Sequence, residues 1–346
     1  MTRFGFGIIG AGVIATTHAE AITRVPGARL AAVTDTSLES AKRLAELSGC
    51  AAEPDIDALL ARDDVDIVAV CVPSGLHAEV GVAAAAAGKH LIVEKPIDVT
   101  LEAADRLIGA ARATGVKLTV ISQHRFDPGI VELRRLIDDG ALGTLLLGEA
   151  STKWYRSQAY YDSGTWRGTW ALDGGSLMNQ GVHYVDLLLA CMGPVAEVTA
   201  ITATQTHQIE VEDVALALLR FRSGAVGTIV SSTSVYPGLA QRLEISGTQG
   251  TVVIEDGEII SRGLAGEPAD GQTADRQPDG QPTGASTPDI GIASHVAQIA
   301  EFVDAIEHDR EPSPTAQDGR AAMEVVLAVY ESARERRTVK IPLAAT

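Results

Sequence analysis

The chain has 346 residues, 46% of them hydrophobic and 21% charged, a composition that excludes a disordered protein and leaves room for two globular domains. Its formal net charge of −17 argues against nucleic acid or an anionic membrane surface as a partner, because both are polyanions. The three cysteines lack metal-ligand spacing, and no signal peptide or membrane-spanning apolar run is evident, so we expect a cytoplasmic protein that holds no metal.

In residues 1–125, short runs of β-branched residues alternate with alanine-rich helical stretches. Strands are predicted at 4–9, 29–34, 66–72, 90–94 and 117–122, and helices at 14–23, 38–47, 75–87 and 101–113. Alternation of this kind builds a parallel sheet that is covered on both faces. Ligands of such a sheet bind at the carboxyl ends of its strands.

We predict a second, α+β domain from residue 126 to residue 346, in which the pattern of residues 195–260 is almost all β. A helix at 130–138, a strand at 144–154, an aromatic loop and a helix at 176–192 are followed by strands at 195–204, 214–221, 225–232, 241–246 and 251–254. Residues 261–290 are rich in Gly, Pro, Asp and Gln and are predicted to form a mobile loop. Helices at 293–307 and 317–335 complete this domain, whose sheet is predicted to be mostly antiparallel.

The first strand leads into Gly10-Ala11-Gly12-Val13-Ile14-Ala15, which fits the G-x-G-x-x-G/A pattern of dinucleotide-binding domains. Gly10 permits a tight turn, Gly12 lets a pyrophosphate approach the backbone, and the next helix offers its N-terminal N–H groups to the phosphates. Asp35 ends the second strand, where a carboxylate binds ribose hydroxyls, and no arginine follows it to accommodate a 2′-phosphate. We therefore expect a Rossmann domain that prefers NAD to NADP; a glycine turn with an unrelated acidic cap is the alternative.

The predicted helix at 176–192, with two glycines before it and Gly193 after it, carries two stripes when its residues are placed about 100° apart. The apolar stripe consists of Met178, Val182, Val185 and Leu189, and the polar stripe of Asn179, His183 and Asp186. A row of amide, imidazole and carboxylate among apolar neighbours is either a self-satisfied network of the core or an acid–base site.

Glu94-Lys95-Pro96 follows the fourth strand of the parallel sheet. Alone, it is either a surface ion pair before a turn or a lysine beside a bound cofactor. Together with "GIIGAGVIA", "VPSGLHAEV" and "GGSLMNQGVHYVD", it resembles the glucose–fructose oxidoreductase / inositol dehydrogenase / rhizopine catabolism (Gfo/Idh/MocA) family. The resemblance implies an N-terminal Rossmann domain, a C-terminal domain with an open-faced sheet, activity on sugars and cyclitols, and assembly into homodimers or homotetramers.

The resemblance also implies that Lys95 and His183 flank the reacting carbon, and either of them is the base. Many members carry Asp where this chain has Asn179, and an amide cannot take a proton, so Asn179 is expected to orient the substrate or the imidazole. Asp186 is expected either to hold the His183 ring or to form a buried salt bridge. His77 is expected to lie near the nicotinamide or, alternatively, on a helix surface.

On these grounds the predicted catalytic residues are Lys95, His183 and Asn179. Cofactor contacts are predicted at Gly10, Gly12, Val13, Ile14, Asp35, Pro73, Ser74, His77, Glu94, Lys95, Gln123, Trp166 and Arg167. Substrate contacts are predicted at Lys95, Arg125, Tyr155, Arg156, Tyr160, Tyr161, Asn179, Gln180 and His183. Gln123 and Arg125 are alternatively polar caps of the strand that precedes them.

The segment 153–170 holds all three tryptophans and three of the six tyrosines, interleaved with Lys153, Arg156 and Arg167. Aromatic faces suit sugar C–H groups, and arginines suit carboxylate or phosphate, so a plain core patch explains the segment poorly. The segment is similar to the family branch that oxidises UDP-N-acetylglucosaminuronate at the 3-position and re-oxidises NADH in place with 2-oxoglutarate. Alternatives are a dehydrogenase of a free sugar or inositol, a non-catalytic NAD-binding regulator, and a glycosidase that acts by transient oxidation.

Overall fold

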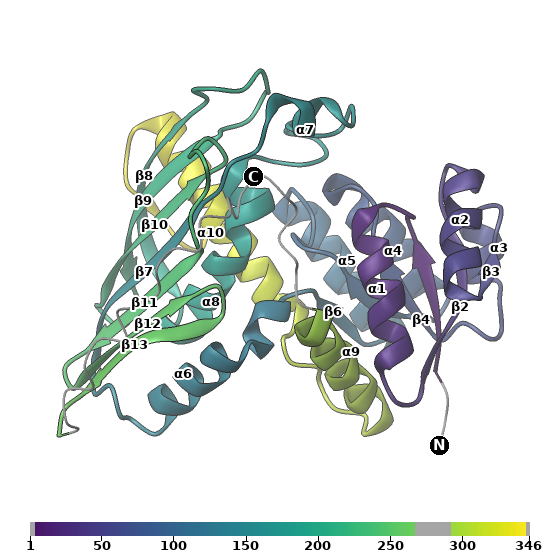
Figure 1. Cartoon of the computed structure of the whole chain (residues 1–346), viewed down its shortest axis with the longest axis horizontal. Coiled ribbons are helices and arrows are strands. Elements are labelled where there is room, and N and C mark those ends of the chain that lie inside the picture. The colour runs from purple at the N-terminus through teal and green to yellow at the C-terminus, as the bar shows by residue number, and fades with distance from the viewer. Residues whose placement is uncertain (1–3, 267–291, 344–346) are drawn as a thin grey trace. The chain divides into compact units, whose positions relative to one another are not determined.

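The computed structural model describes residues 4–266 and 292–343, and these residues form two compact units (Figure 1). The first unit takes the described residues up to Gln123 and from 292 to Arg320. The second takes those from His124 to 266 and from Ala321 to 343.

The first unit is a Rossmann-type domain, as predicted. Its strands are β1 (Phe4–Ile9), β2 (Ala28–Thr34), β3 (Ala51–Ala52), β4 (Ile67–Val70), β5 (His90–Val93) and β6 (Leu118–Val120). They pair in parallel in the order β3-β2-β1-β4-β5-β6. The order reverses direction between β1 and β4, and a crevice at such a point is where dinucleotides bind in this fold.

The helices of this unit are α1 (Val13–Arg24), α2 (Leu38–Ser48), α3 (Ile56–Leu60), α4 (His77–Ala86) and α5 (Leu101–Thr114). Local capping explains the bounds of α2 and α5: Ser37 and Thr100 accept backbone N–H groups at their starts, and left-handed Gly49 and Gly115 end them. The predicted helix at 75–87 begins later than expected, because Ser74–Leu76 form a 3-10 turn before α4. Sequence patterns missed only the short β3 and α3 here.

Helix α9 (Ile292–Glu307) belongs to the first unit, which corrects its assignment to the second domain. It lies beside α1 (Figure 1), and its buried Ile299, Phe302 and Val303 share a hydrophobic core with Ile22 of α1 and Phe6 of β1. Helix α9 therefore covers apolar residues of α1. No local pattern in the sequence predicts this long-range contact. Helix α10 (Ala316–Glu335) starts in the first unit and continues in the second.

The second unit is built on an eight-stranded sheet of order β13-β12-β11-β7-β10-β9-β8-β14. Its elements are α6 (Pro128–Asp138), β7 (Leu145–Lys153), α7 (Gln158–Asp162), α8 (Val182–Met192), β8 (Val195–Ala203), β9 (Val214–Phe221), β10 (Val226–Ser232), β11 (Arg242–Gly247), β12 (Gly250–Glu255), β13 (Glu258–Leu264) and β14 (Val339–Lys340). All neighbouring strands are antiparallel except β7 and β10, so the sheet is mostly antiparallel as predicted.

The two faces of this sheet differ. Helix α8 packs on one face, where a Cβ on Gly148 of β7 would lie 2.7 Å from Met192 and 2.8 Å from Leu188, so the glycine permits close approach of the helix (Figure 1). On the other face Ile201 and Leu218 are 71% and 64% exposed. The sheet is therefore open-faced, as the family resemblance implied.

Two local predictions need correction in this unit. The predicted loop at 261–290 begins too early, because 261–264 belong to β13, which pairs antiparallel with β12 across the Asp256-Gly257 turn. Residues 267–290 of that loop lie outside the described residues. The helix predicted at 176–192 starts as a π-helix, Ser176–Gly181, before α8 begins, so a uniform rotation of 100° per residue does not hold across its first turns.

Candidate active site

The Gly-rich turn after β1 has the conformation that a dinucleotide pyrophosphate needs. Gly10 has a φ of 98°, and a Cβ there would overlap the Cys71 carbonyl, so only glycine fits. Gly12 caps α1 without any side-chain cap, and a Cβ on it would meet nothing within 4 Å. Val13 in the first turn is 74% exposed. The uncapped helix N-terminus faces open space and can hold phosphate oxygens.

Asp35 lies against this turn at the end of β2. Its Oδ2 accepts the N–H of Ala11 at 2.7 Å, and its Oδ1 accepts the N–H of Ser37 at 2.7 Å. The carboxylate is thus fixed beside the Gly-rich turn and still has lone pairs for ribose hydroxyls. Thr36 and Ser37 follow it and carry no positive charge.

Replacing Asp35 with serine is expected to weaken NAD binding about tenfold and to improve NADP binding, because the ribose acceptor and the charge that repels a 2′-phosphate are both removed. Titration of NADH and NADPH fluorescence measures both dissociation constants. The variant Ser37→Ala is the control, because it leaves the carboxylate in place. Unchanged affinities for both dinucleotides would contradict the assignment of Asp35 to the ribose.

The remaining predicted cofactor residues of the first unit gather at the carboxyl ends of β4, β5 and β6. Pro73 and Ser74 follow β4, Glu94 and the half-buried Lys95 follow β5, and Gln123 follows β6. Gln123 is buried, and its Oε1 has no hydrogen-bond partner within the described part of the chain. An orphaned acceptor at this edge of the sheet fits a ligand that brings a donor.

One of the two predicted settings of His77, a helix surface, is wrong, and the other, near the nicotinamide, stays a prediction. It is buried rather than on a helix surface, and its Nδ1 and Nε2 lie 2.7 Å from the Pro96 carbonyl and 2.9 Å from the Val72 carbonyl. Burial lowers the pKa of this imidazole, against the backbone hydrogen bonds that favour its charged form. His77 therefore ties the loop after β4 to the loop after Lys95.

In the second unit, the π-helix that carries Asn179 starts over a buried carboxyl group. Glu212 Oε1 accepts the Leu177 N–H at 2.8 Å and the Tyr330 hydroxyl at 3.1 Å. A Cβ on Gly175 would overlap Glu212 Oε2, so the glycine lets the carboxyl group reach the helix start. Burial raises the pKa of Glu212 to about 7, although the Leu177 and Tyr330 hydrogen bonds favour its ionised form.

Between pH 4.5 and about 7 the folded unit retains a proton on Glu212 that the unfolded chain releases, so its stability should fall as the pH rises through this window. The loss amounts to as much as about 3 kcal/mol. In Glu212→Gln this contribution should disappear. Urea unfolding followed by tryptophan fluorescence measures it, because all three tryptophans belong to the second unit. Parallel stability curves for the variant and the wild type would refute the assignment.

Asn179 is half-buried and its amide orientation is fixed from two sides. Its Nδ2 donates to Asp173 Oδ1, and its Oδ1 accepts Gln180 Nε2 at 2.8 Å. Gln180 Nε2 also lies 3.3 Å from the Tyr160 hydroxyl, and Asp173 is buried and accepts the Gly168 N–H at 2.7 Å. The predicted substrate residues Asn179, Gln180 and Tyr160 are thus brought together in one network.

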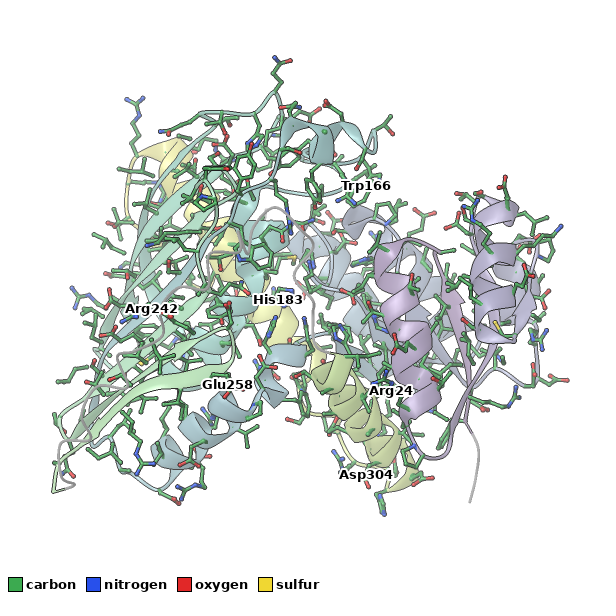
Figure 2. All side chains as sticks on the ribbon, in the orientation of Figure 1. Arg24, Trp166, His183, Arg242, Glu258 and Asp304 are labelled. Carbon is green, nitrogen blue, oxygen red and sulfur yellow. The ribbon has the colours of Figure 1, made fainter. Side chains whose placement is uncertain are left out.

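His183 lies one turn further on, half-exposed on α8 (Figure 2). The His124 ring meets it edge-on, with 5.1 Å between ring centroids. His124 Nδ1 is in turn 2.7 Å from Asp127 Oδ2. The predicted base therefore has a second histidine as a neighbour, which the sequence analysis did not identify.

Asp186 forms the buried salt bridge that was one of its two predicted roles. Arg125 Nε donates to Oδ2 at 2.7 Å and Arg125 Nη2 donates to Oδ1 at 2.5 Å. Both carboxylate oxygens therefore accept N–H groups of one guanidinium, and a contact of Asp186 with the His183 ring stays a prediction. The same contact occupies the Nε and Nη2 edge of the Arg125 guanidinium, and the predicted contact of Arg125 with the substrate stays a prediction.

The aromatic segment is a stack of arginines and rings that includes the short helix α7. The Arg156 guanidinium lies 5.1 Å from the Trp154 ring and 5.0 Å from the Tyr160 ring, and Arg167 lies 4.3 Å from Tyr160 and 4.4 Å from Trp166. Arg156 Nε is buried and has no hydrogen-bond partner among the described residues.

Two predicted substrate residues of this segment, Tyr161 and Tyr155, contact side chains that lie outside it. Tyr161 is buried, and its hydroxyl lies 2.8 Å from Thr233 Oγ1, so it belongs to the core of the second unit. Tyr155 packs edge-on against Tyr236, with 5.2 Å between ring centroids.

Sequence reasoning missed His18, His124, Asp173 and Glu212. Asp173 lies directly before two glycines and Glu212 directly after a valine, and neither belongs to a periodic pattern that would predict its burial. His18, in contrast, belongs to the helix that follows the glycine motif. A polar residue on the buried stripe of a predicted helix was the one signal that could have singled out His18.

Neither a metal centre nor a membrane span is found in the part of the chain that the structure describes. In residues 4–266 and 292–343 no three His, Cys, Asp or Glu side chains are grouped so that they could hold a metal ion. No helix within these residues is both long and apolar enough to cross a bilayer.

The fold and the Gly-rich site together define an NAD-binding oxidoreductase. Residues 4–122 match the oxidoreductase family with an NAD-binding Rossmann fold, and residues 130–253 match the GFO/IDH/MocA C-terminal domain. The chain belongs to the Gfo/Idh/MocA family, whose members include sugar and cyclitol dehydrogenases.

Similar proteins cover almost the whole chain. Inositol 2-dehydrogenase of Rhizobium meliloti is 30% identical over 97% of this chain and 98% of its own length. D-apiose dehydrogenase of Paraburkholderia graminis is 28% identical over 98% and 90%. The WlbA dehydrogenase from Bordetella pertussis, solved in complex with NADH and UDP-GlcNAcA, is 31% identical over 99% of both chains, with a TM-score of 0.89.

Proposed function

We propose that this enzyme oxidises a secondary alcohol of a sugar nucleotide that carries a uronate carboxylate, with the 3-hydroxyl of UDP-N-acetylglucosaminuronate as the best candidate. The likeness to the WlbA dehydrogenase, whose complex contains UDP-GlcNAcA, supports this substrate class. The observation that carries the proposal is the arginine pair of the aromatic segment.

Arg156 and Arg167 both lie over aromatic rings of this segment. Neither forms an ion pair with a carboxylate in the described residues, and Arg156 Nε is left without an acceptor. Burial lowers the pKa of Arg156, which means that its charge is held at a cost. An anionic group on the substrate would offset that cost and supply the missing acceptors. Inositols and free neutral sugars have no such group.

We assign the proton chemistry to Lys95 and His183, with Asn179 as an orienting residue. Bound NAD supplies a nicotinamide carbon that accepts a hydride from the substrate carbon. Either Lys95 Nζ or a His183 ring nitrogen takes the hydroxyl proton. Asn179 contributes a fixed amide, because Asp173 and Gln180 hold its two ends.

The direct test incubates the purified protein with UDP-N-acetylglucosaminuronate and 2-oxoglutarate, and detects a 3-keto sugar nucleotide and 2-hydroxyglutarate by mass spectrometry. In this cycle the α-keto acid is reduced as the bound NADH is re-oxidised. Both products should form in equal amounts. Absence of turnover here, with NADH formed from myo-inositol, would replace the sugar-nucleotide assignment by that of an inositol dehydrogenase.

The arginine assignment is tested by Arg156→Met, which should raise the KM for the sugar nucleotide about 20-fold or more, since a charge-assisted contact is lost. Arg222→Met, in the exposed turn between β9 and β10, removes the same charge elsewhere and is the control. Equal KM values in the two variants would remove Arg156 from the substrate site.

A dehydrogenase of free inositol is the second candidate. The observation that favours it is the 30% identity to inositol 2-dehydrogenase of Rhizobium meliloti over nearly the full length of both chains. NADH formation with myo-inositol, independent of Arg156, is the result that would favour it.

We also propose that the open sheet face is covered in a homodimer or homotetramer. Leu216 of β9 pairs with Ile201 of β8, and Leu218 lies on the same face, so apolar side chains form one exposed patch. Leu216→Glu combined with Leu218→Glu is expected to produce monomers in light scattering. Val131→Glu, at an exposed apolar residue of α6, is the control. A wild-type monomer would refute this proposal.

A further inference from the structure

His18 is a buried histidine in the helix that follows the Gly-rich turn. It is 1% exposed, and its Nε2 donates to Glu94 Oε1 at 2.8 Å. Glu94 is 5% exposed and directly precedes Lys95. A glutamate at the end of a strand can reach solvent with its flexible side chain. Here an imidazole from α1 holds it inside the unit.

The second oxygen of Glu94 is held by the residue next to it. Glu94 Oε2 accepts the backbone N–H of Lys95 at 3.1 Å. One carboxylate therefore connects α1, through His18, with the main chain at Lys95. Because the N-terminus of α1 is the part of the fold that fits the cofactor phosphates, this connection links the phosphate-binding helix to the lysine.

The charges of this pair make the connection strong. Burial alone would lower the pKa of His18, but Cys71 and Glu94 outweigh it and raise the pKa to about 10. For Glu94, burial alone would raise the pKa, but the His18 hydrogen bond and charge lower it to about 2. Cys71, Glu94 and His295 face the His18 ring from three other segments, with His295 at 5.8 Å between ring centroids. Loss of either partner would leave a buried charge uncompensated.

We propose that His18 is a positioning residue for Lys95, and that it acts through Glu94 to fix the main chain and the electrostatic surroundings of the lysine. The acid–base role of Lys95 is part of the proposed function, so this inference rests on that function. In the absence of such a role, His18 and Glu94 would be an ordinary ion pair of the core, important for stability alone.

Two amide variants separate these possibilities. His18→Gln places an amide nitrogen near the position of Nε2 and can still donate to Glu94. His18→Asn is also neutral and polar, but its shorter amide corresponds to Nδ1 and does not reach Glu94. His90→Asn, at the opposite end of β5, is the control for loss of a histidine in this unit.

Turnover gives the first readout. His18→Asn should lower kcat about 30-fold while the KM for NAD changes less than about threefold, because a misplaced catalytic group affects the chemical step more than binding. His18→Gln should restore kcat to within about threefold of the wild type. Equal kcat values for the two variants would overturn the proposal.

The second readout needs no turnover and therefore separates a failure of this inference from a failure of the proposed function. The rate of reductive methylation of Lys95 is measured by peptide mass spectrometry against that of the exposed Lys42. The charges of Glu94 and Lys95 already interact, and a carboxylate released from His18 can approach the Lys95 ammonium more closely, so labelling should slow about threefold or more in His18→Asn. His18→Gln should label at nearly the wild-type rate. Wild-type labelling in His18→Asn, with or without a fall in melting temperature, would overturn the inference.

Discussion

If Lys95 is the base, replacing it with methionine is expected to lower kcat for alcohol oxidation by about 10³-fold, because the substitution then removes the proton acceptor while the apolar part of the side chain is kept. The dissociation constant of NADH should change less than about threefold, since the Gly-rich turn and Asp35 are untouched. Absorbance of NADH under saturating substrate measures the first quantity, and fluorescence titration measures the second.

Lys42→Met is the matched control, because Lys42 is exposed on α2, in the same unit. His183→Gln completes the comparison. If Lys95 is the base, raising the pH should not restore activity to Lys95→Met, and an added small amine should restore part of it. Turnover by Lys95→Met within about tenfold of the wild type would move the base to His183.

The Rossmann half of the fold could be predicted from the sequence because its signals are local. The strands of the parallel sheet other than β3 are short apolar runs, and α2 and α5 begin and end at residues with clear capping chemistry, such as Ser37 and Gly49. The Gly-rich turn is equally local, since the φ of Gly10 and the overlap that a Cβ would cause both follow from one tight turn. Long-range packing is what the patterns missed, as the position of α9 beside α1 shows.

The candidate site was less predictable because its partners are distant in sequence. Asp186 and Arg125 are 61 positions apart, and His18 and Glu94 are 76 positions apart. Both pairs depend on how strands and helices are brought together. The stripe argument for Asn179 and His183 placed them on one helix, yet the π-helix at its start changes the rotation between residues. The composition of residues 261–290 predicted a loop, but its first four residues, 261–264, continue a hairpin as part of β13.

Replacing Arg125 with methionine is expected to destabilise the second unit by about 3–5 kcal/mol, because Asp186 is left buried without its counter-charge. Asp186→Leu should be similarly costly, since it leaves the guanidinium without its carboxylate partner. The double variant Arg125→Met with Asp186→Leu should regain most of this loss, because both charges are removed and apolar side chains take their place. Urea unfolding followed by tryptophan fluorescence gives the coupling energy of the pair.

The same double variant decides what Arg125 does for catalysis. If Arg125 only holds α8 through Asp186, the folded double variant should retain a substrate KM within about threefold of the wild type, because no ligand contact has been lost. If the guanidinium also binds the substrate, the KM should rise about 20-fold or more although stability is restored. The bidentate geometry, with both Asp186 oxygens occupied at 2.5 and 2.7 Å, favours the first result. If the double variant instead loses as much stability as the two single variants together, the ion pair is not the interaction that holds α8.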